Sequence, residues 1–377
     1  MYSEQIWENH FDTDAKSCIL RLYVQSQAKG CCGGGVLRGV CTHTYENIIK
    51  VENLLAAWEE FRRGKRKRAD VLQFQTDLMG NILSLHHDLA NKTYQHGGYE
   101  HFVVTDPKRR DIHKASVRDR LLHHAIYRIL YPFFDARFIH DSYSCRNEKG
   151  THRAMNQFQK YAQQVSRNNT RTVWVLKCDI RKFFASIDHS VLMQILGKSI
   201  NDKDVLWLLG NVIFSFNSGQ LGRGLPLGNL TSQLFVNIYM NGFDQYMKHK
   251  LKARYYLRYA DDFVIFGRNK IKLTEILSYM IVFLRDHLGL ELHPRKVSIS
   301  TYASGVDFLG WVHFPHHHVL RTVTKRRVIK KLKDPKLNES SGQSYLSLLS
   351  HGNAYKIRQK YQSSINGLTV AERGSLW

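Results

Sequence analysis

The chain has 377 residues, 43% of them hydrophobic, which is enough for a sizeable core and for two or three lobes. Its charge is unbalanced, because 55 Lys and Arg residues stand against 32 Asp and Glu residues and give a net charge of +23. Such an excess is typical of proteins that neutralise phosphate groups. No apolar run approaches the roughly 18 residues of a spanning helix, and the start lacks the regions of a signal peptide. We therefore expect a cytoplasmic protein without membrane contact.

Residues 1–44 form an N-terminal segment to which the sequence assigns no role. Its Cys31, Cys32, Cys41 and His43 could be imagined as zinc ligands, but adjacent cysteines are not the usual ligand spacing. Reduced thiols are the simpler interpretation for cysteines in a long intracellular chain. A zinc site is therefore not expected here.

Two helices are predicted next, because apolar residues recur at helical spacing over 45–61 and again over 71–89. The stretch between them is strongly basic and contains Arg62, Arg63, Lys65, Arg66, Lys67 and Arg68. A run of this kind has three interpretations: a solvated loop, a nuclear targeting signal, or a surface that contacts the phosphate backbone of RNA. The function of the remaining chain decides among them.

Two short strands around a basic turn are predicted over 102–112, and the turn carries Lys108, Arg109 and Arg110. Further along, an apolar run ends at Asp179, which is typical of a buried central strand with a carboxylate at its end. An acidic group in that place is costly unless another group pairs with it. Asp179 is therefore a candidate ligand for a cation.

A second acidic site lies within 255–267, where Asp261 and Asp262 stand between two runs rich in aromatic and branched apolar residues. Such runs predict two strands, with the acidic pair at or near the tip of a hairpin. The simple alternative is a polar turn, because Asp is common in turns. If the strand ending at Asp179 lies beside this hairpin, however, three carboxylates converge on an oxygen-only site suited to magnesium. Two such ions, about 4 Å apart, promote phosphoryl transfer, so these residues indicate nucleotidyl-transfer chemistry.

Three motifs in this order resemble those of reverse transcriptases. Tyr-Ala-Asp-Asp at residues 259–262 resembles the Tyr-x-Asp-Asp motif of these enzymes, and residues 179–188 resemble their preceding acidic motif. Between the two, residues 224–233 resemble the nucleotide-binding motif. The resemblance extends from about Asn47 to Gln359, which is most of the chain.

Details of the nucleotide-binding motif indicate a subtype. Gly228, Ser232 and Gln233 fit a Gly-x-x-x-Ser-Gln ending, whereas most relatives have Gln-Gly-x-x-x-Ser-Pro. Leu227 stands where the common glutamine would touch the nucleotide. This form resembles the reverse transcriptases of diversity-generating retroelements. That resemblance implies error-prone copying of a template RNA into cDNA and a small, basic, helical accessory protein as a partner.

The resemblance implies an α+β fold of the right-hand polymerase type, with fingers, a palm made of an antiparallel sheet plus helices, and a helical thumb. We accordingly expect N-terminal helices and fingers over 45–170, the palm over 171–311 with part of the fingers inserted around 195–220, and the thumb over 312–377. Template RNA, an RNA/DNA hybrid and deoxynucleoside triphosphates (dNTPs) are the implied substrates. Contact with an RNA backbone then becomes the preferred interpretation of the basic run 62–68.

The resemblance also assigns the catalytic residues. Asp179, Asp261, Asp262 and the backbone carbonyl of Ile180 would hold two Mg²⁺ ions, for which Mn²⁺ can substitute. Lys296 matches a lysine that could protonate the pyrophosphate leaving group or hold the phosphates, and the alternative is a solvated loop lysine.

Other residues are assigned to substrate contacts. Phe184 corresponds to the aromatic gate beneath the sugar, where a bulky ring would collide with a 2′-hydroxyl and favour deoxynucleotides. Cations fork onto triphosphate oxygens, and the candidates are Lys108, Arg109 and Arg110. The other predicted nucleotide-binding residues are Leu227, Gly228, Ser232 and Gln233. The predicted primer grip, a hairpin whose backbone positions the primer end, consists of Phe308, Leu309, Gly310 and Trp311. The basic residues predicted to contact nucleic acid from the thumb are Lys325, Arg326 and Arg327.

Two alternatives to this assignment stay open. The first is a related reverse transcriptase of a retron or of phage defence, which the neighbouring genes would distinguish. The second is a catalytically inactive RNA-binding protein that keeps the fold. The presence of Asp179, Asp261 and Asp262 argues against the second alternative.

Overall fold

The computed structural model describes residues 44–105, 108–334, 337 and 339–361. The cysteines considered above as zinc ligands lie outside the described residues, as does the end of the chain from residue 362. In the part of the chain that is described, none of the helices combines the length and the apolar character needed to cross a membrane. The described ranges contain every residue assigned above to the catalytic and nucleotide-binding groups.

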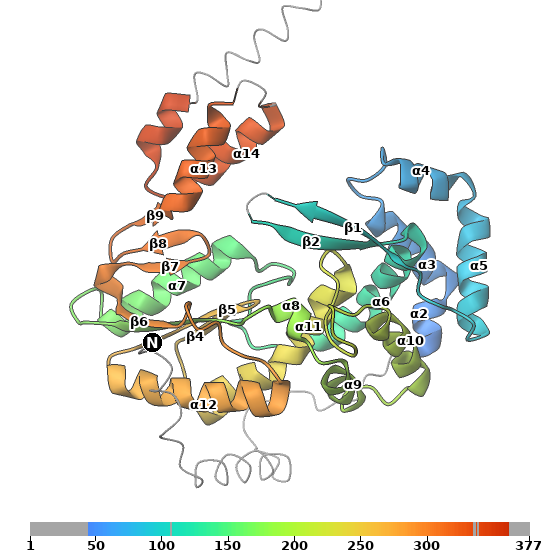
Figure 1. The fold of residues 1–377 in the computed structure, drawn as a ribbon, viewed down its shortest axis with the longest axis horizontal. Helices are drawn as coiled ribbons and strands as arrows, with labels where there is room; N and C mark the ends of the chain where they lie inside the picture. Colours follow the sequence, from blue (N-terminus) through green and yellow to red (C-terminus); the bar gives the residue numbers. More distant parts are fainter. Residues whose placement is uncertain (1–43, 106–107, 335–336, 338, 362–377) are drawn as a thin grey trace, which may run out of the picture. The chain divides into compact units, whose positions relative to one another are not determined.

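Four short helices pack on one another and against a longer helix, α6 (Figure 1). These helices are α2 (Tyr45–Ile49), α3 (Val51–Phe61), α4 (Ala69–Thr76), α5 (Leu78–Ala90) and α6 (Val117–Asp135). The helical spacing predicted over 45–61 is confirmed, with a break at Lys50 between α2 and α3. The apolar residues Leu54, Trp58 and Phe61 of α3 are buried, as the spacing requires.

The single helix predicted over 71–89 is wrong, because the structure has two helices there. Asp77 lies between them with φ −127° and ψ 57°, outside the helical region. Its side chain accepts a hydrogen bond from the backbone N–H of Gly80 at 3.2 Å and so caps the start of α5. An N-capping aspartate inside an apolar pattern is thus enough to divide the helix.

The predicted basic hairpin is present as β1 (Tyr99–Val104) and β2 (Arg110–Ala115), which pair in antiparallel fashion. The hairpin is fastened to the loop that precedes α11. The backbone N–H of His113 donates to the carbonyl of Leu227 at 3.1 Å, and the side-chain amide of Asn229 donates to the carbonyl of His113 at 3.1 Å. These two bonds bring the hairpin against the predicted nucleotide-binding motif.

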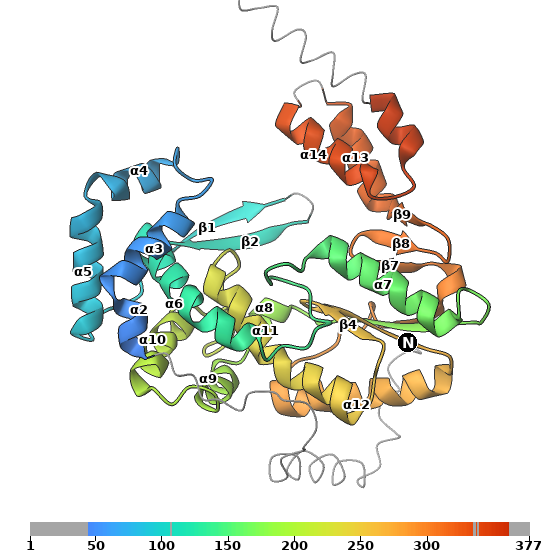
Figure 2. The same ribbon diagram turned by 180° about the vertical axis from the view of Figure 1, so that it is seen from behind.

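A four-stranded antiparallel sheet in the order β4-β5-β3-β6 carries both acidic segments. Its strands are β3 (Trp174–Asp179), β4 (Tyr256–Tyr259), β5 (Asp262–Gly267) and β6 (Ser298–Thr301). Figures 1 and 2 show helices α7 (Thr151–Ser166) and α12 (Lys270–Leu288) on opposite faces of this sheet.

Side chains of β5 alternate between these two faces, as expected for a strand that is buried on both sides. Phe266 packs on Phe158 of α7, with ring centroids 4.8 Å apart. Phe263 instead contacts Phe243 of α11 at 5.5 Å, and Phe243 in turn contacts Phe283 of α12 at 5.7 Å. The sheet is therefore held rigidly between helices.

Apolar residues at helical spacing predict connecting helices over 189–200, 205–216 and 230–250. Helices are present there with shifted ends: α9 (His189–Gly197), α10 (Lys203–Phe214) and α11 (Leu230–Gln245), and a π-helical turn (Tyr246–Lys250) follows α11. A short helix, α8 (Phe183–Ser186), follows the strand that ends at Asp179, and a 3-10 turn (Tyr302–Ser304) follows β6.

A second, three-stranded sheet and two helices follow. They are β7 (Val306–Phe308), β8 (Trp311–His313), β9 (His318–Leu320), α13 (Thr322–Leu332) and α14 (Glu339–Ser350). The Ser- and Gly-rich stretch 338–342 predicts a break between helices, and this prediction is wrong, because α14 begins at Glu339 and includes Gly342. Leu346 and Leu349 are buried in a core shared with Trp311, and this packing outweighs the low helix propensity of the first turn.

Candidate active site

The two acidic segments meet at one end of the four-stranded sheet. The antiparallel register of β3 and β5 places Asp179 directly opposite Asp262. The backbone N–H of Ile180 donates to the carbonyl of Asp261 at 3.1 Å, which adds one hydrogen bond beyond the paired strands. Because directly opposed residues project from the same face of a sheet, the side chains of Asp179 and Asp262 share one face. The predicted position of the acidic pair at a hairpin tip is confirmed.

The tip itself is a tight turn. Tyr259 pairs with Asp262, so that Ala260 and Asp261 form the connection between β4 and β5. Ala260 adopts a left-handed backbone conformation with φ 55°. That conformation costs a non-glycine residue about 1–2 kcal/mol, so surrounding interactions must hold it.

Burial raises the pKa of both carboxyl groups at the tip. For Asp261, burial is the largest cause and the negative charge of Asp179 is the next. For Asp262, burial raises the pKa to about 6, the charge of Lys177 opposes this rise, and the charges of Asp261 and Asp179 add to it. The acidic cluster is therefore short of positive charge in the protein alone.

Two lysines supply part of the missing charge. The Nζ of Lys296 donates to both carboxylate oxygens of Asp179 at 2.8 Å, and Lys177 Nζ lies 3.7 Å from Asp262 Oδ1. Lys296 is 42% exposed, so it can leave this pair for a substrate. Lys296 thus lies beside the acidic cluster, whereas its part in the reaction stays a prediction.

The residues at this end of the sheet fit a divalent cation. Asp262 Oδ1 is buried and has no hydrogen-bond partner, which leaves an acceptor for a ligand. Carboxylate oxygens suit Mg²⁺, which binds through one or two carboxylates and completes its shell with phosphate oxygens and water. Among the described residues, however, no three His, Cys, Asp or Glu side chains are grouped closely enough to hold a metal. The predicted convergence of three carboxylates is therefore looser than expected, and the role of the Ile180 carbonyl stays a prediction.

The predicted nucleotide-binding loop leads into α11. Gly228 has φ +107°, and a Cβ atom there would come within 3.0 Å of Ile112 Cγ2 on the basic hairpin. Only glycine meets both conditions easily, which is a physical reason for Gly228 in this motif. Gln233 lines a pocket together with Gly228, whereas Ser232 is buried. Direct nucleotide contacts of Leu227, Ser232 and Gln233 stay predictions.

The two phenylalanines after Asp179 differ in exposure. Phe183 is buried at 3% exposure, while Phe184, the predicted gate, is only partly buried. Their rings contact each other edge to face, with centroids 5.7 Å apart. The carbonyl of Phe184 accepts a hydrogen bond from the N–H of Leu225 at 2.8 Å, which fixes the backbone of the predicted gate.

Of the three cations at the tip of the basic hairpin, one acts electrostatically on the acidic cluster. The positive charge of Lys108 lowers the pKa of Asp261, against the larger effect of burial. Lys108, Arg109 and Arg110 are all exposed. Asp106 and Pro107 of the same turn lie outside the described residues. Lys108 is the best candidate for a phosphate contact near the aspartates.

The predicted primer grip is the hairpin of β7 and β8. Phe308 and Trp311 are buried, and the turn between them consists of Leu309 with φ 51° and Gly310 with φ 86°. Because the side chains of Phe308 and Trp311 point into the core, only the turn between them is available to a ligand. The contact of this turn with a primer stays a prediction. Beyond the hairpin, Lys325 and Arg326 are exposed on α13, and Arg327 is partly buried.

The basic run between α3 and α4 borders a pocket. Arg62 is tied to Glu59 by hydrogen bonds of 2.8 and 2.9 Å, whereas Arg63, Arg66, Lys67 and Arg68 are exposed. The pocket has a volume of about 370 Å³ and touches the nucleotide-binding loop. The described residues that line it include four cations and no acid: Phe61, Lys65, Arg68, Phe102, Ile112, Lys114, Arg120, His123, His124, Gly228, Asn229, Leu230 and Gln233.

Like charges and burial set the protonation of this lining. Burial and the charges of Arg120 and Arg68 lower the pKa of Lys65. Burial lowers the pKa of His124 to about 4, assisted by Lys65, Arg120 and Arg128. The pocket therefore favours an anionic ligand, and we call it the cationic pocket.

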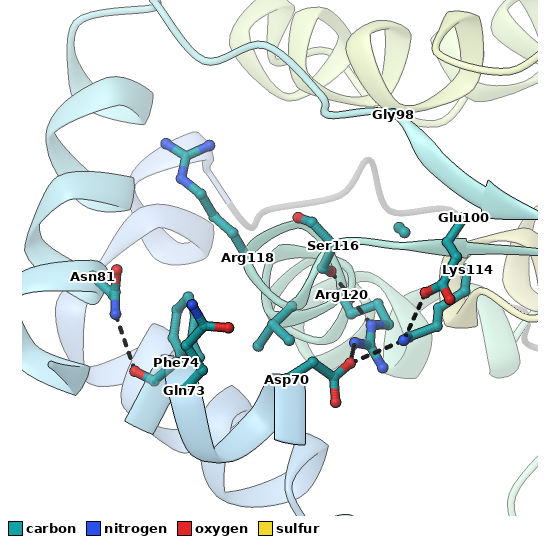
Figure 3. A pocket seen from close by; sticks show the side chains of 12 residues that line it. Asp70, Gln73, Phe74, Asn81, Gly98, Glu100, Lys114, Ser116, Arg118 and Arg120 are labelled. Atoms are coloured by element: carbon teal, nitrogen blue, oxygen red, sulfur yellow. Dashed lines mark hydrogen bonds and ion pairs between the residues drawn. The ribbon is translucent and has the colours of Figure 1, made fainter. Parts of the chain in front are cut away.

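A larger pocket of about 620 Å³ shares Lys114 and Arg120 with the cationic pocket (Figure 3). Its charges are balanced within the chain. Figure 3 shows Asp70 between Arg120 and Lys114, and Lys114 also reaches Glu100 at 2.9 Å. Its lining contains none of the three catalytic aspartates, so we do not assign it to the chemical step.

Several residues that support the site were not predicted from the sequence. Lys177 stands two residues before Asp179, and the alternation of side chains along a strand could have placed it on the same face. Asn229, which fastens the basic hairpin, follows the glycine of the motif directly. Arg258 and Asp244, which form a buried pair beneath the aspartate turn, gave no local signal.

This combination of an antiparallel sheet with paired acidic residues at one end, flanked by helices and a basic hairpin, defines a right-hand polymerase. The predicted α+β fold is confirmed. Residues 98–313, more than half of the chain, match the family model described as "Reverse transcriptase (RNA-dependent DNA polymerase)". The chain belongs to this reverse transcriptase family, as the sequence motifs predicted.

Proteins similar to this chain are found in bacteria and in yeast. Protein YkfC of Escherichia coli (strain K12) is 27% identical over 243 residues, which cover 54% of this chain and 62% of that protein. The putative COX1/OXI3 intron 2 protein of Saccharomyces cerevisiae is 23% identical over 278 residues, 57% of this chain and 30% of that protein. The group II intron-encoded protein LtrA of Lactococcus lactis subsp. cremoris is 20% identical over 271 residues, which cover 54% of this chain and 44% of that protein. The chain thus matches less than two thirds of the length of each.

Solved structures with a similar fold include telomerases. The telomerase of Candida albicans in complex with a TWJ fragment of telomeric RNA has 12% identity and a TM-score of 0.48, with 73% of this chain and 55% of that chain covered. The apo telomerase of Candida tropicalis truncated from its C-terminal domain has 13% identity and a TM-score of 0.45, with 64% and 60% covered.

Proposed function

We propose that this chain is an RNA-directed DNA polymerase that copies an RNA template into cDNA. The observation that carries the proposal is the register that sets Asp179 opposite Asp262, with Asp261 beside them at a turn. The raised pKa values of Asp261 and Asp262 support it, because they mark a cluster of negative charge that a bound cation would relieve. Membership of the reverse transcriptase family supports the same reaction.

We assign Asp179, Asp261 and Asp262 to the binding of two Mg²⁺ ions, for which Mn²⁺ can substitute. When bound, such ions activate the attacking oxygen and stabilise the leaving oxygen in phosphoryl transfer. Lys296 shares the carboxylate of Asp179 in the protein alone. With a cation bound at that carboxylate, the ammonium group of Lys296 would be available to donate to phosphate oxygens or to give a proton to the pyrophosphate. Lys108 would hold the incoming triphosphate from the hairpin side.

The proposed nucleic-acid substrates are the template RNA and the RNA/DNA hybrid. We place a template phosphate in the cationic pocket, because Lys65 and Arg68 line it without an acidic neighbour in that lining. The pocket touches Gly228, which has no side chain that would keep a base away from the backbone. The exposed Lys325 and Arg326 on α13 would follow the hybrid backbone on the thumb side.

The proposed monomers are deoxynucleoside triphosphates, selected at the sugar by Phe184. Its ring is partly exposed, and its backbone is fixed to Leu225. We propose the fingers over 45–170, the palm over 171–311 and the thumb over 312–377 as the corresponding lobes.

Primer extension on a defined RNA template with a DNA primer, dNTPs and Mg²⁺ tests the proposal. We expect extension by the wild-type chain and none above background by Asp261→Asn. Asp286→Asn on α12 is the matched control, because it removes an exposed carboxylate that pairs with Arg285 away from the turn. Equal extension by Asp261→Asn and the wild type would remove the proposed enzymatic function and leave an RNA-binding protein.

We further propose the error-prone subtype found in diversity-generating retroelements, with a small basic helical protein as partner. Leu227 cannot make the polar contact of a glutamine, which loosens the selection of the incoming base. Sequencing of cDNA made on a defined template measures the error rate. We expect frequent errors that Leu227→Gln reduces, and an error rate unchanged by this substitution would count against the subtype.

A group II intron-type function is the second candidate, favoured by the names of the similar proteins. The flanking DNA separates the candidates. A template and variable repeat pair supports the first, intron sequence supports the second, and a structured noncoding RNA or defence genes would indicate a retron or phage-defence enzyme.

A further inference from the structure

A fully buried ion pair lies directly beneath the turn that carries the catalytic aspartates. Arg258 of β4 and Asp244 of α11 both have side chains that are 0% exposed. The guanidinium binds the carboxylate in bidentate fashion, with Nε 2.8 Å from Oδ1 and Nη2 2.7 Å from Oδ2. The hydroxyl of Tyr256 adds a third bond to Asp244 at 2.6 Å.

The same guanidinium reaches three further groups. Its Nη1 donates to the carbonyl of Ala260 at 3.1 Å. Its Nη2 donates to Ser142 Oγ at 3.1 Å and to Asn237 Oδ1 at 3.3 Å. Arg258 therefore connects α11, the segment that precedes α7 and the aspartate turn through a single side chain.

The backbone of Arg258 strengthens this connection. Its N–H donates to the carbonyl of Asp141 at 2.9 Å, and its carbonyl accepts from the N–H of Tyr143 at 3.0 Å. These bonds fix the base of the arginine side chain on both sides. The position of the guanidinium therefore does not depend on its contact with Ala260.

The bond to Ala260 has a particular consequence. Ala260 is in the left-handed conformation, which costs a residue with a Cβ atom about 1–2 kcal/mol. A charged donor aimed at its carbonyl stabilises that conformation more than a neutral donor would. The next residue, Asp261, uses its own carbonyl to accept from Ile180 on the neighbouring strand, and Asp262 then stands opposite Asp179. A rotation of Ala260 would move both tip carboxylates away from Asp179.

Stability alone does not account for this pair. Hydrophobic residues of similar volume in place of a buried ion pair are often neutral or stabilising, because the pair gives up two hydration shells. A lysine would keep the charge, but its three donors radiate from one atom and cannot span Asp244 and Ala260 as a planar guanidinium does.

We infer that Arg258, oriented by Asp244, is a positioning residue that locks the aspartate turn in the geometry needed to bind divalent cations. This inference rests on the proposed function. It extends that proposal from the residues that touch the substrates to the buried group that places them.

The test compares two kinds of variant. Arg258→Lys keeps the positive charge, but the lysine cannot bind Asp244 and the carbonyl of Ala260 at the same time. The double variant Arg258→Met/Asp244→Leu removes both charges together, so that neither charge is left buried without the other. The control Arg128→Met/Glu60→Leu removes a partly buried pair that joins α6 to α3 and does not contact the turn. Mn²⁺ affinity is measured by electron paramagnetic resonance on the full chain without nucleic acid, beside the melting temperature of each variant.

We expect the Mn²⁺ dissociation constant to rise by about 10–100-fold in both Arg258 variants, the range for residues that orient metal ligands, while the control keeps the wild-type value. In primer extension, kcat should fall with little change in the KM for dNTPs. Wild-type Mn²⁺ affinity in folded Arg258 variants would overturn the inference. So would a loss that disappears when the affinity is expressed per folded molecule, because it would show a role in stability alone.

The two proposals fail in different ways. A wild-type chain that binds Mn²⁺ but extends no primer contradicts the polymerase function, while the effect of Arg258 on Mn²⁺ affinity still decides the positioning role. Arg258 variants that extend primers as well as the wild-type chain does contradict only the positioning role.

Discussion

Two regions of the molecule carry charges of one sign that nearby residues balance only in part, and the signs are opposite. At the hairpin tip, burial raises the pKa of Asp261 and, to about 6, that of Asp262. In the cationic pocket, burial and like charges lower the pKa of Lys65 and His124. In both regions the surroundings disfavour the charged form of the side chains. A bound ligand of the opposite charge would stabilise that form in each region.

A third region shows that the fold can balance buried charge when no ligand is involved. Arg258 and Asp244 are completely buried, yet every polar atom of the pair finds a partner within the chain. Unbalanced charge at the tip and in the pocket is therefore a property of those sites and does not reflect poor packing. It indicates a divalent cation at one site and a phosphate at the other.

The largest expected effect comes from Asp262→Asn, which removes one of the three carboxylates at the hairpin tip. We expect primer extension to fall by at least on the order of 10²-fold, because a ligand should matter more than the residues that orient it. Burial raises the pKa of Asp262 from 3.8 to about 6. Its carboxylate therefore destabilises the metal-free protein increasingly as pH rises from about 4 to 6. The variant should accordingly unfold at a temperature no lower than the wild type at pH 7, and a wild-type rate of extension would contradict the assignment.

Gly228→Ala sharpens the comparison at the border of the cationic pocket. The added Cβ meets Ile112 at 3.0 Å on a backbone with φ +107°, so we expect a loss of about 1–3 kcal/mol in unfolding free energy and weaker template use. Chemical denaturation and primer extension measure the two effects. Gly242→Ala in α11 is the control, since its Cβ would enter open space and alanine favours a helix. Equal effects of the two substitutions would show that the loop is not constrained.

Lys65→Gln/Arg68→Gln removes two cations from the pocket. Affinity for single-stranded RNA should fall, and the slope of log affinity against log salt concentration should shrink by about 1–2, because each phosphate contact releases a counterion. Fluorescence anisotropy at several salt concentrations gives this slope. Lys272→Gln, an exposed lysine on α12, should change neither quantity, and an unchanged slope in the double variant would place the phosphate elsewhere.

The smallest effect concerns pH and His124. Its pKa is depressed to about 4 by burial and neighbouring cations, so the unfolded chain binds the proton more readily between about pH 6.5 and 4. Stability from this group is present above pH 6.5 and is lost, by about 1–3 kcal/mol, as the pH falls through that window. His124→Gln should flatten the denaturation free energy over this range. A profile as steep as the wild type would assign the pH dependence to other groups.

The sequence predicted those parts of the fold that depend on neighbours in the chain. The strands around Asp261 and Asp262, the strand that ends at Asp179 and the basic hairpin all followed from local composition, and all are present. The division of the helix at Asp77 was missed, because a single capping aspartate gives little signal within an apolar pattern of helical spacing. The start of α14 was missed because buried leucines overrule a polar first turn.

The structure brings together the acidic segments that the sequence predicted to meet, but most of the residues that support them were missed. Lys296 and Asp179 are 117 residues apart, and their pairing was not predicted. Arg258 directly precedes the Tyr-Ala-Asp-Asp motif, yet its partner Asp244 is on a helix whose burial no local pattern indicates. Pairings of this kind depend on the packed fold and therefore could not be predicted from spacing.

The central claim is that one cation site is shared by two segments far apart in the sequence. Fe²⁺ in place of Mg²⁺, with ascorbate and peroxide, generates hydroxyl radicals that cut the backbone beside a bound ion. We predict cuts close to Asp179 and close to Asp261 and Asp262 in the wild-type chain, suppressed by excess Mg²⁺ and absent from Asp262→Asn. Cuts at one segment alone, or cuts elsewhere that Mg²⁺ also suppresses, would contradict the account.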